Sequence, residues 1–223
     1  MWFFSSIFIP VLRICSSSLK KEYEDFSQLI GLASQIVFFG SIYLYIKKSL
    51  STLGAHFRLI FWNESNEFSW ERFKFYGKKV GFVFLAEMLA TIALSQIIKL
   101  IIPKDGPQQS ENEKQIQESL RGATAFLTII SVLIFAPVFE ELIYRRSMLK
   151  ITNFHTSVLF SSALIFGMAH LEVTKETIFH IIPYFMGGLV FGWSYKKFRN
   201  IWISIFAHFL HNFTVLFIVL VRI

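Results

Sequence analysis

Hydrophobic residues gather in long runs along this chain, separated by shorter polar segments. Runs near the length that crosses a hydrocarbon core of roughly 30 Å as a helix occur at 27–46, 80–102, 122–144, 156–172, 178–195 and 201–221. Residues 1–14 are also apolar, but they are short, lack a charged start and show no small-residue cleavage site, so we expect no signal peptide. The pattern predicts an all-α transmembrane bundle of six spans, or seven if the N-terminal segment crosses.

Two polar stretches interrupt this pattern. Residues 47–79 mix aromatic and charged side chains, which is typical of a segment lying along the membrane interface. Residues 104–121 begin with an Asp-Gly-Pro turn and continue with Gln and Glu, which indicates a solvated linker or a short helix. We therefore expect an N-terminal membrane region over 1–121 and a C-terminal core over 122–223.

Composition agrees with a membrane location. Of the 223 residues, 54% are hydrophobic and 27 are Phe, and we expect most of these rings to face lipid. The formal charge is +7, but the cations form short clusters between apolar runs, so membrane lipid is the expected partner and nucleic acid is not. Cys15 is the only cysteine, which excludes an intrachain disulfide and a cysteine metal cluster.

Cation distribution predicts the orientation of the spans. The positive-inside rule places the loop with the most Lys and Arg in the cytoplasm, and that is the loop after the first predicted span. Alternation then puts two later clusters on the same side. The cations concerned are Lys47, Lys48, Arg58, Arg72, Lys74, Lys78 and Lys79, then Arg145, Arg146 and Lys150, and finally Lys196, Lys197 and Arg199.

Ionisable residues inside spans are costly and need a partner or a function, and the first such group is Glu140-Glu141. On a helix, Glu141 and Arg145 are four residues apart and face each other, so Arg145 can keep Glu141 ionised. Glu140 points about 100° away from that pair. One carboxylate is therefore predicted to be structural and the other to be free.

Two further groups follow along the chain. His170 lies near the end of an apolar run, and His208 and Asn212 share one face of the last span. His211 points elsewhere and is expected either to support a residue of the site or to be a packing residue. Measured by helical rise from the cytoplasmic turns, the four groups Glu140, His170, His208 and Asn212 stand at ~16, ~21, ~12 and ~18 Å. This agreement in depth predicts a single site.

The chemistry of this set allows two mechanisms. A carboxylate and an imidazole can deprotonate a water between them, and a His/Asn pair can donate to the oxyanion of a tetrahedral intermediate. The same Glu and two His could instead hold Zn²⁺, with Asn212 as the oxyanion donor. The spacing leaves both possibilities open.

Three motifs, Glu140-Glu141-x-x-x-Arg145, Phe166-x-x-x-His170 and His208-x-x-x-Asn212, resemble those of the CPBP intramembrane protease family over about 122–215. That family includes type II CAAX prenyl endopeptidases and bacterial Abi proteins linked to bacteriocin processing and self-immunity. The resemblance departs at Arg146, where a small residue is common.

The resemblance implies a role for each motif residue. Glu140 and His170 would activate water, His208 and Asn212 would stabilise the oxyanion, and Glu141 with Arg145 would fix the geometry. A mechanism without a metal is favoured, because the second motif has one histidine rather than the paired histidines of common zinc proteases. The expected substrate is a membrane-associated peptide or protein, either prenylated or a leader peptide, in a bacterial or archaeal cell membrane.

Two other functions would leave different marks in the sequence. A non-catalytic binding or immunity protein would be expected to lose motif residues, and a small transporter would be expected to show an inverted repeat; neither feature is found in the sequence. Glu87 in the second predicted span is expected to make a polar contact or to face a cavity rather than to take part in catalysis. Gly188-x-x-x-Gly192 predicts close packing of the fifth span against a neighbour.

Overall fold

The computed structural model describes residues 47, 51–101, 110–121, 125–171 and 178–222. The chain divides into two compact units, Met1–Arg58 and Leu59–Ile223. In the first unit, residue 47 and residues 51–58 are helical. The predicted segment 1–14 and the predicted span 27–46 lie outside the described residues, and the predicted domain boundary at 121 stays a prediction.

The second unit is built from helices. They are α3 (Trp70–Ile101), α4 (Glu111–Leu120), α5 (Ala125–Ile130), α6 (Ala136–Glu140), α7 (Met148–Ile151), α8 (Thr156–Met168), α9 (Ile181–Phe198) and α10 (Ile201–Arg222). Two π-helical turns, η2 (Ser131–Phe135) and η3 (Glu141–Ser147), join α5, α6 and α7 into one rod, and a 3₁₀ turn, η4 (Ile178–His180), precedes α9. Strand pairing in the described ranges is limited to one bridge between Trp62 and Phe68. The predicted all-α class is therefore confirmed.

Three of the described helices are long and apolar enough to cross a membrane: Trp70–Ile101, Ala125–Ile151 and Ile201–Val221. Helix α8 is apolar but has 13 residues, a rise of about 20 Å, which is short of a full hydrocarbon core. Helix α9 covers most of the predicted fifth span. The predicted count of six or seven spans is thus not confirmed.

The start of α3 differs from the sequence prediction. The structure begins this helix at Trp70, ten residues before the predicted span at 80, so the end of the expected interfacial segment is part of a 32-residue helix. Its rise of about 48 Å exceeds a hydrocarbon core, and the excess can hold the aromatic and cationic residues of its first turns at the interface. A hydropathy pattern identifies the apolar part of such a helix and misses its polar first turns.

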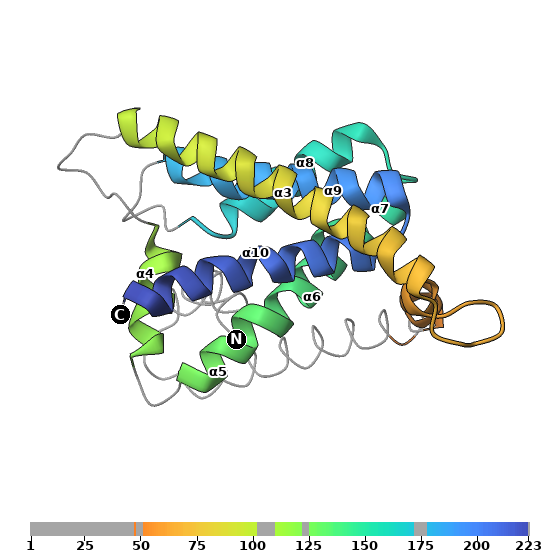
Figure 1. The fold of residues 1–223 in the computed structure, drawn as a ribbon. Coiled ribbons are helices and arrows are strands. Elements are labelled where there is room, and N and C mark those ends of the chain that lie inside the picture. Colours follow the sequence, from red (N-terminus) through yellow and green to blue (C-terminus); the bar gives the residue numbers. More distant parts are fainter. Residues whose placement is uncertain (1–46, 48–50, 102–109, 122–124, 172–177, 223) are drawn as a thin grey trace, which may run out of the picture. The chain divides into compact units, whose positions relative to one another are not determined.

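Helices α3, α9 and α10 pack against one another, and α8 packs against α9 (Figure 1). A Cβ at Gly188 would lie 2.9 Å from the Ala163 Cα, and one at Gly192 would lie 2.4 Å from a Leu159 methyl carbon. Since these distances leave no room for a side chain, the predicted close approach of the Gly188-x-x-x-Gly192 face is confirmed, and α8 is the partner.

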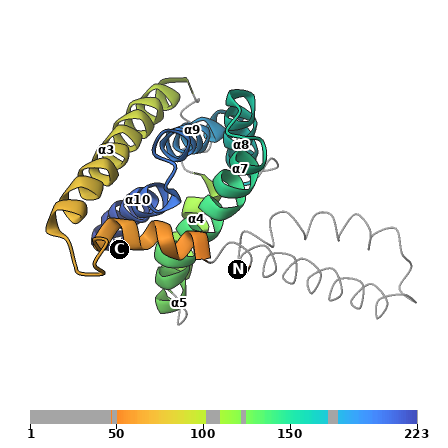
Figure 2. The ribbon, with the colours of Figure 1, turned by 90° about the vertical axis from the view of Figure 1, so that its right-hand side faces the viewer.

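Short turns set the height of the site residues. Helices α7 and α8 are joined through Asn153 and Phe154, both with positive φ, and α9 ends at Arg199, whose φ is 56°. Helix α10 begins two residues later, at Ile201. Figure 2 shows α8, α9 and α10 together in the view turned by 90°. Both turns lie at the positions from which the depths of the site residues were counted, near residues 153–155 and 200.

Helix α4 forms within the predicted polar linker. Ser110 caps it by accepting the Glu113 N–H at 3.2 Å, and Leu120 at its end packs with Leu216 and Val219 of α10. Large apolar side chains on the other helices remain exposed, as expected for a surface in lipid. Among them are Phe82, Leu85, Leu89, Phe126, Phe160, Phe213 and Phe217.

Candidate active site

Glu140 occupies the point where α6 passes into the π-helical turn η3. It is 6% exposed, so its carboxylate lies within the protein rather than in lipid. A π-helical turn widens the helix by one residue and changes the direction of its side chains, and such turns are frequent at functional sites. The carbonyl of Tyr144 in this turn accepts a hydrogen bond from Ser162 of α8, which ties the turn to its neighbour.

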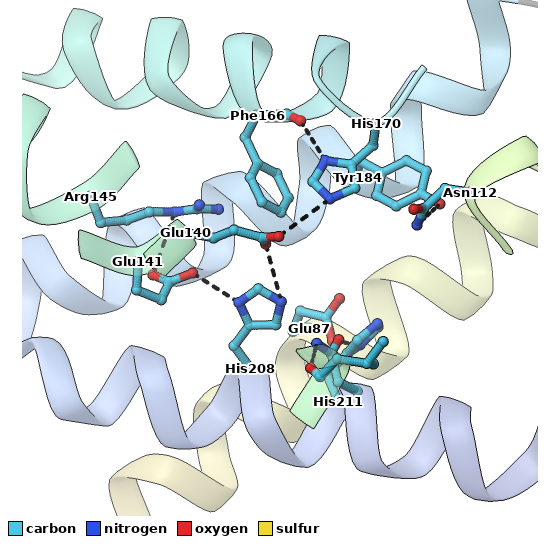
Figure 3. Close-up of polar contacts among 12 residues, drawn as sticks. Glu87, Asn112, Glu140, Glu141, Arg145, Phe166, His170, Tyr184, His208 and His211 are labelled. Carbon is cyan, nitrogen blue, oxygen red and sulfur yellow. Dashed lines mark hydrogen bonds and ion pairs between the residues drawn. The ribbon is translucent and has the colours of Figure 1, made fainter. Parts of the chain in front are cut away.

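Two imidazoles converge on the Glu140 carboxylate (Figure 3). The Nε2 of His170 lies 3.8 Å from one carboxylate oxygen, and the Nε2 of His208 lies 3.7 Å from the other. These separations are longer than direct hydrogen bonds. They are the distances at which one water can bridge a carboxylate and an imidazole.

His170 is held in a defined orientation just beyond the end of α8. Its Nδ1 donates to the carbonyl of Phe166 at 2.8 Å, and its ring stacks on Tyr184 with centroids 4.7 Å apart. Because Nδ1 carries the proton that the carbonyl accepts, the neutral ring presents a lone pair at Nε2 toward Glu140. His170 is therefore arranged to accept a proton from a bridging water.

His208 is oriented by the second carboxylate of the first motif. Its Nδ1 lies 3.1 Å from Glu141 Oε1, and its ring stacks on Phe191 at 4.8 Å. With Nδ1 donating to Glu141, Nε2 can donate only when the ring carries a second proton there, as the imidazolium. In that form His208 can donate a hydrogen bond toward developing negative charge.

Glu141 and Arg145 form the predicted pair one turn apart. Arg145 Nε lies 3.5 Å from Glu141 Oε2, and both side chains are fully buried. The guanidinium carbon also lies 4.2 Å from the centroid of the Phe166 ring, where a cation–π interaction offsets part of its desolvation. Arg145 thus supports the carboxylate that orients His208.

Asn212 lies one turn beyond His208 but bonds elsewhere. Its Nδ2 donates to the Val132 carbonyl at 2.8 Å. In the π-helical pattern of η2 that carbonyl would pair with the N–H of residue 137, which is a proline and has none. Asn212 fills this gap and thereby links α10 to the rod that carries Glu140. The amide retains a second N–H.

Arg146 was the one departure from the family pattern, and it is fully buried. Its three guanidinium nitrogens have no hydrogen-bond partner among the described residues. A buried charge without a partner is costly. Arg146 lies beside the site, in the same π-helical turn as Arg145.

Sequence reasoning missed the aromatic support of the site and its link to α4. The Tyr184 hydroxyl, from the ring that stacks on His170, lies 2.8 Å from Ser110 Oγ and accepts from Asn112 at 3.4 Å. These contacts join residues more than 70 positions apart. No local motif could have revealed them.

The same residues are the candidates for a zinc site. Within the described ranges, no group of three or more His, Cys, Asp or Glu side chains is arranged to hold a metal ion. We therefore derive no step through a metal.

The fold and the site define a helical membrane protein with a buried carboxylate–imidazole centre. Residues 122–214 match the family described as type II CAAX prenyl endopeptidase Rce1-like, and this match supports the resemblance of that segment to the CPBP family. A protein of Bacillus subtilis (strain 168), named "Putative membrane peptidase YdiL", is 29% identical over 109 residues, which are 47% of this chain and 41% of that protein. The chain thus spans about two fifths of the length of this curated relative. No solved structure matches the chain.

Proposed function

We propose that this protein is an intramembrane endopeptidase that hydrolyses a peptide bond of a membrane-associated protein or peptide. The observation that carries the proposal is the position of the Glu140 carboxylate between two imidazole nitrogens, at 3.7 and 3.8 Å, inside a helical membrane protein. A water held there is polarised by a base on one side and can attack a carbonyl carbon on the other. The family match over residues 122–214 supports the same reaction class.

The roles follow from the contacts of each residue. Glu140 takes a proton from the water, with His170 Nε2 as its partner. His208 and the unused N–H of Asn212 stabilise the oxyanion, while Glu141 and Arg145 hold His208 in place. All of these groups belong to the chain itself.

Substrate and location form part of the proposal. The family description makes a prenylated C-terminal peptide the first substrate to test, and a leader peptide is the alternative. We place the protein as a multi-pass protein of a bacterial or archaeal cell membrane. Lys150 and the cations at 196–199 then put the opening of the site toward the cytoplasm.

The experiment compares the peptides of a membrane fraction that contains the wild-type protein with those of a matched fraction that contains Glu140→Ala. Mass spectrometry should find cleaved peptides in the wild-type fraction and the uncleaved precursors in the variant fraction. Identical peptide profiles at equal protein levels would contradict the proposed function.

A further inference from the structure

A second set of polar contacts lies beside the Glu140 cluster, between α3 and α10 (Figure 3). His211 Nδ1 lies 2.6 Å from Glu87 Oε2, and Thr91 Oγ1 donates to Glu87 Oε1 at 2.7 Å. Both carboxylate oxygens accept hydrogen bonds, which fixes the orientation of the carboxylate and, through it, of the imidazole. The sequence predicted a polar contact or a cavity-facing position for Glu87, and a supporting or packing role for His211.

Glu87 is enclosed by neighbouring helices. The residue is 2% exposed, and a Cβ at Gly187 of α9 would lie 3.3 Å from its Oε1. Three helices therefore meet at this carboxylate, and α9 has no side chain at its nearest point. A buried carboxylate in a membrane protein needs such partners or a function.

His211 differs from the other two imidazoles in how its nitrogens are used. Both Nε2 atoms of His170 and His208 face Glu140, and both Nδ1 atoms face another acceptor. The Nε2 of His211 has no hydrogen bond in the part of the chain that the structure describes, and the side chain is 21% exposed. Its ring centroid lies 6.5 Å from that of His208. His211 therefore offers a free nitrogen next to the cluster.

Amide hydrolysis requires such a group, because the nitrogen leaves as an amine only if it receives a proton. We propose that His211 is the catalytic acid that protonates the leaving nitrogen, and that Glu87 is the residue that positions it. This inference rests on the endopeptidase function proposed above.

The proton transfers balance over one cycle. The water oxygen bonds to the carbonyl carbon, and one water proton passes to Glu140. The carbon–nitrogen bond then breaks with its electron pair on nitrogen, which takes the proton from His211 Nε2. The proton on Glu140 returns to His211 through water, which restores both groups and leaves a carboxylic acid and an amine.

Glu87 supports this step in two ways. A carboxylate at Nδ1 holds the ring in one orientation, and it stabilises the imidazolium form that gives up the proton from Nε2. Thr91 holds the carboxylate in turn. The same arrangement of carboxylate, imidazole and free nitrogen serves proton transfer in many hydrolases.

The alternative is that the Glu87–His211 contact only clamps α3 to α10, and a choice of substrate separates the two roles. The first probe is a quenched fluorescent peptide with a farnesylated CAAX end, and the second is its thioester analogue at the scissile position. A thiolate leaves without a proton, because a thiol is far more acidic than an amine. Loss of a catalytic acid therefore slows amide cleavage and spares thioester cleavage.

The variant is His211→Asn, since an Asn amide can still donate to Glu87 from the position of Nδ1 and preserve the clamp. In proteoliposomes, we expect kcat on the amide to fall roughly 10²-fold or more, with kcat on the thioester changed by no more than a few fold. Glu87→Gln should likewise lower kcat on the amide much more than kcat on the thioester. His155→Gln, which removes an exposed histidine in the α7–α8 turn, should change neither.

Equal losses on both substrates, or no loss on either, would overturn the assignment of His211 as the acid. Glu140→Gln must abolish cleavage of both substrates, because both need the activated water. If the wild-type protein cleaves neither substrate, the proposed function fails, and the role of His211 fails with it.

Discussion

Glu141 Oε1 lies 3.1 Å from His208 Nδ1, which joins the first and third motifs by a buried hydrogen bond. The same carboxylate reaches Arg145 through its other oxygen, at 3.5 Å. Glu141 therefore orients an imidazole of the site and neutralises a buried cation at once.

Replacing Glu141 should separate these two effects. Glu141→Ala leaves Arg145 unpaired inside the protein, which costs about 3–5 kcal/mol, so we expect a lower melting temperature in detergent and a lower yield. Glu141→Gln keeps an oxygen that can accept from His208 and should lose less stability. A Glu141→Ala protein that melts at the wild-type temperature would contradict the role of the pair.

Arg146 should behave in the opposite way to its neighbour. Its guanidinium is buried without a hydrogen-bond partner among the described residues, and replacing an uncompensated buried charge by an apolar side chain of similar volume is often neutral or stabilising. We expect Arg146→Met to hold or raise the melting temperature and Arg145→Met to lower it. A large loss of stability in Arg146→Met would show that the guanidinium has an acceptor.

Close packing of α8 on α9 can be tested with a single methyl group. Gly188→Ala would place a Cβ 2.9 Å from the Ala163 backbone, so the helices must separate, at a cost of about 1–3 kcal/mol. Gly81→Ala in α3 meets nothing within 4 Å and should be neutral or gain up to about 1 kcal/mol from helix propensity. Thermal unfolding of both variants provides the measurement, and equal effects would count against the tight interface.

Metal dependence separates the two mechanisms that the sequence left open. Because water activation is assigned to Glu140 and His170, purified protein stripped with a strong chelator should keep most of its activity. Elemental analysis should accompany the assay. Activity that is lost on chelation and restored by stoichiometric Zn²⁺ would overturn the glutamate mechanism and leave the protease assignment standing.

The sequence predicted the parts of the site that depend on helical spacing. The Glu141–Arg145 pair follows from a separation of four residues, and Glu140, His170 and His208 meet because the rise from two short turns brings them to one depth. Helix geometry is regular enough for such a calculation, even where π-helical turns add a residue.

Contacts that depend on side-chain direction could not be predicted in this way. The amide of Asn212 turns to the Val132 carbonyl because a proline five residues further on cannot donate to it. His211 faces Glu87 across 124 positions of sequence. The short length of α8 was also missed, since hydropathy does not show where the helix ends.

The central claim is that the Glu140 carboxylate activates the attacking water, and Glu140→Gln tests it most directly because it keeps the shape of the side chain and removes the base. The purified variant and wild-type protein are placed in liposomes at equal amounts with the quenched farnesylated peptide, and Glu118→Gln on the exposed face of α4 is the matched control. We predict that Glu140→Gln folds and melts as the wild type does but shows no cleavage, while Glu118→Gln keeps full activity. Wild-type cleavage rates in a well-folded Glu140→Gln protein would contradict the account.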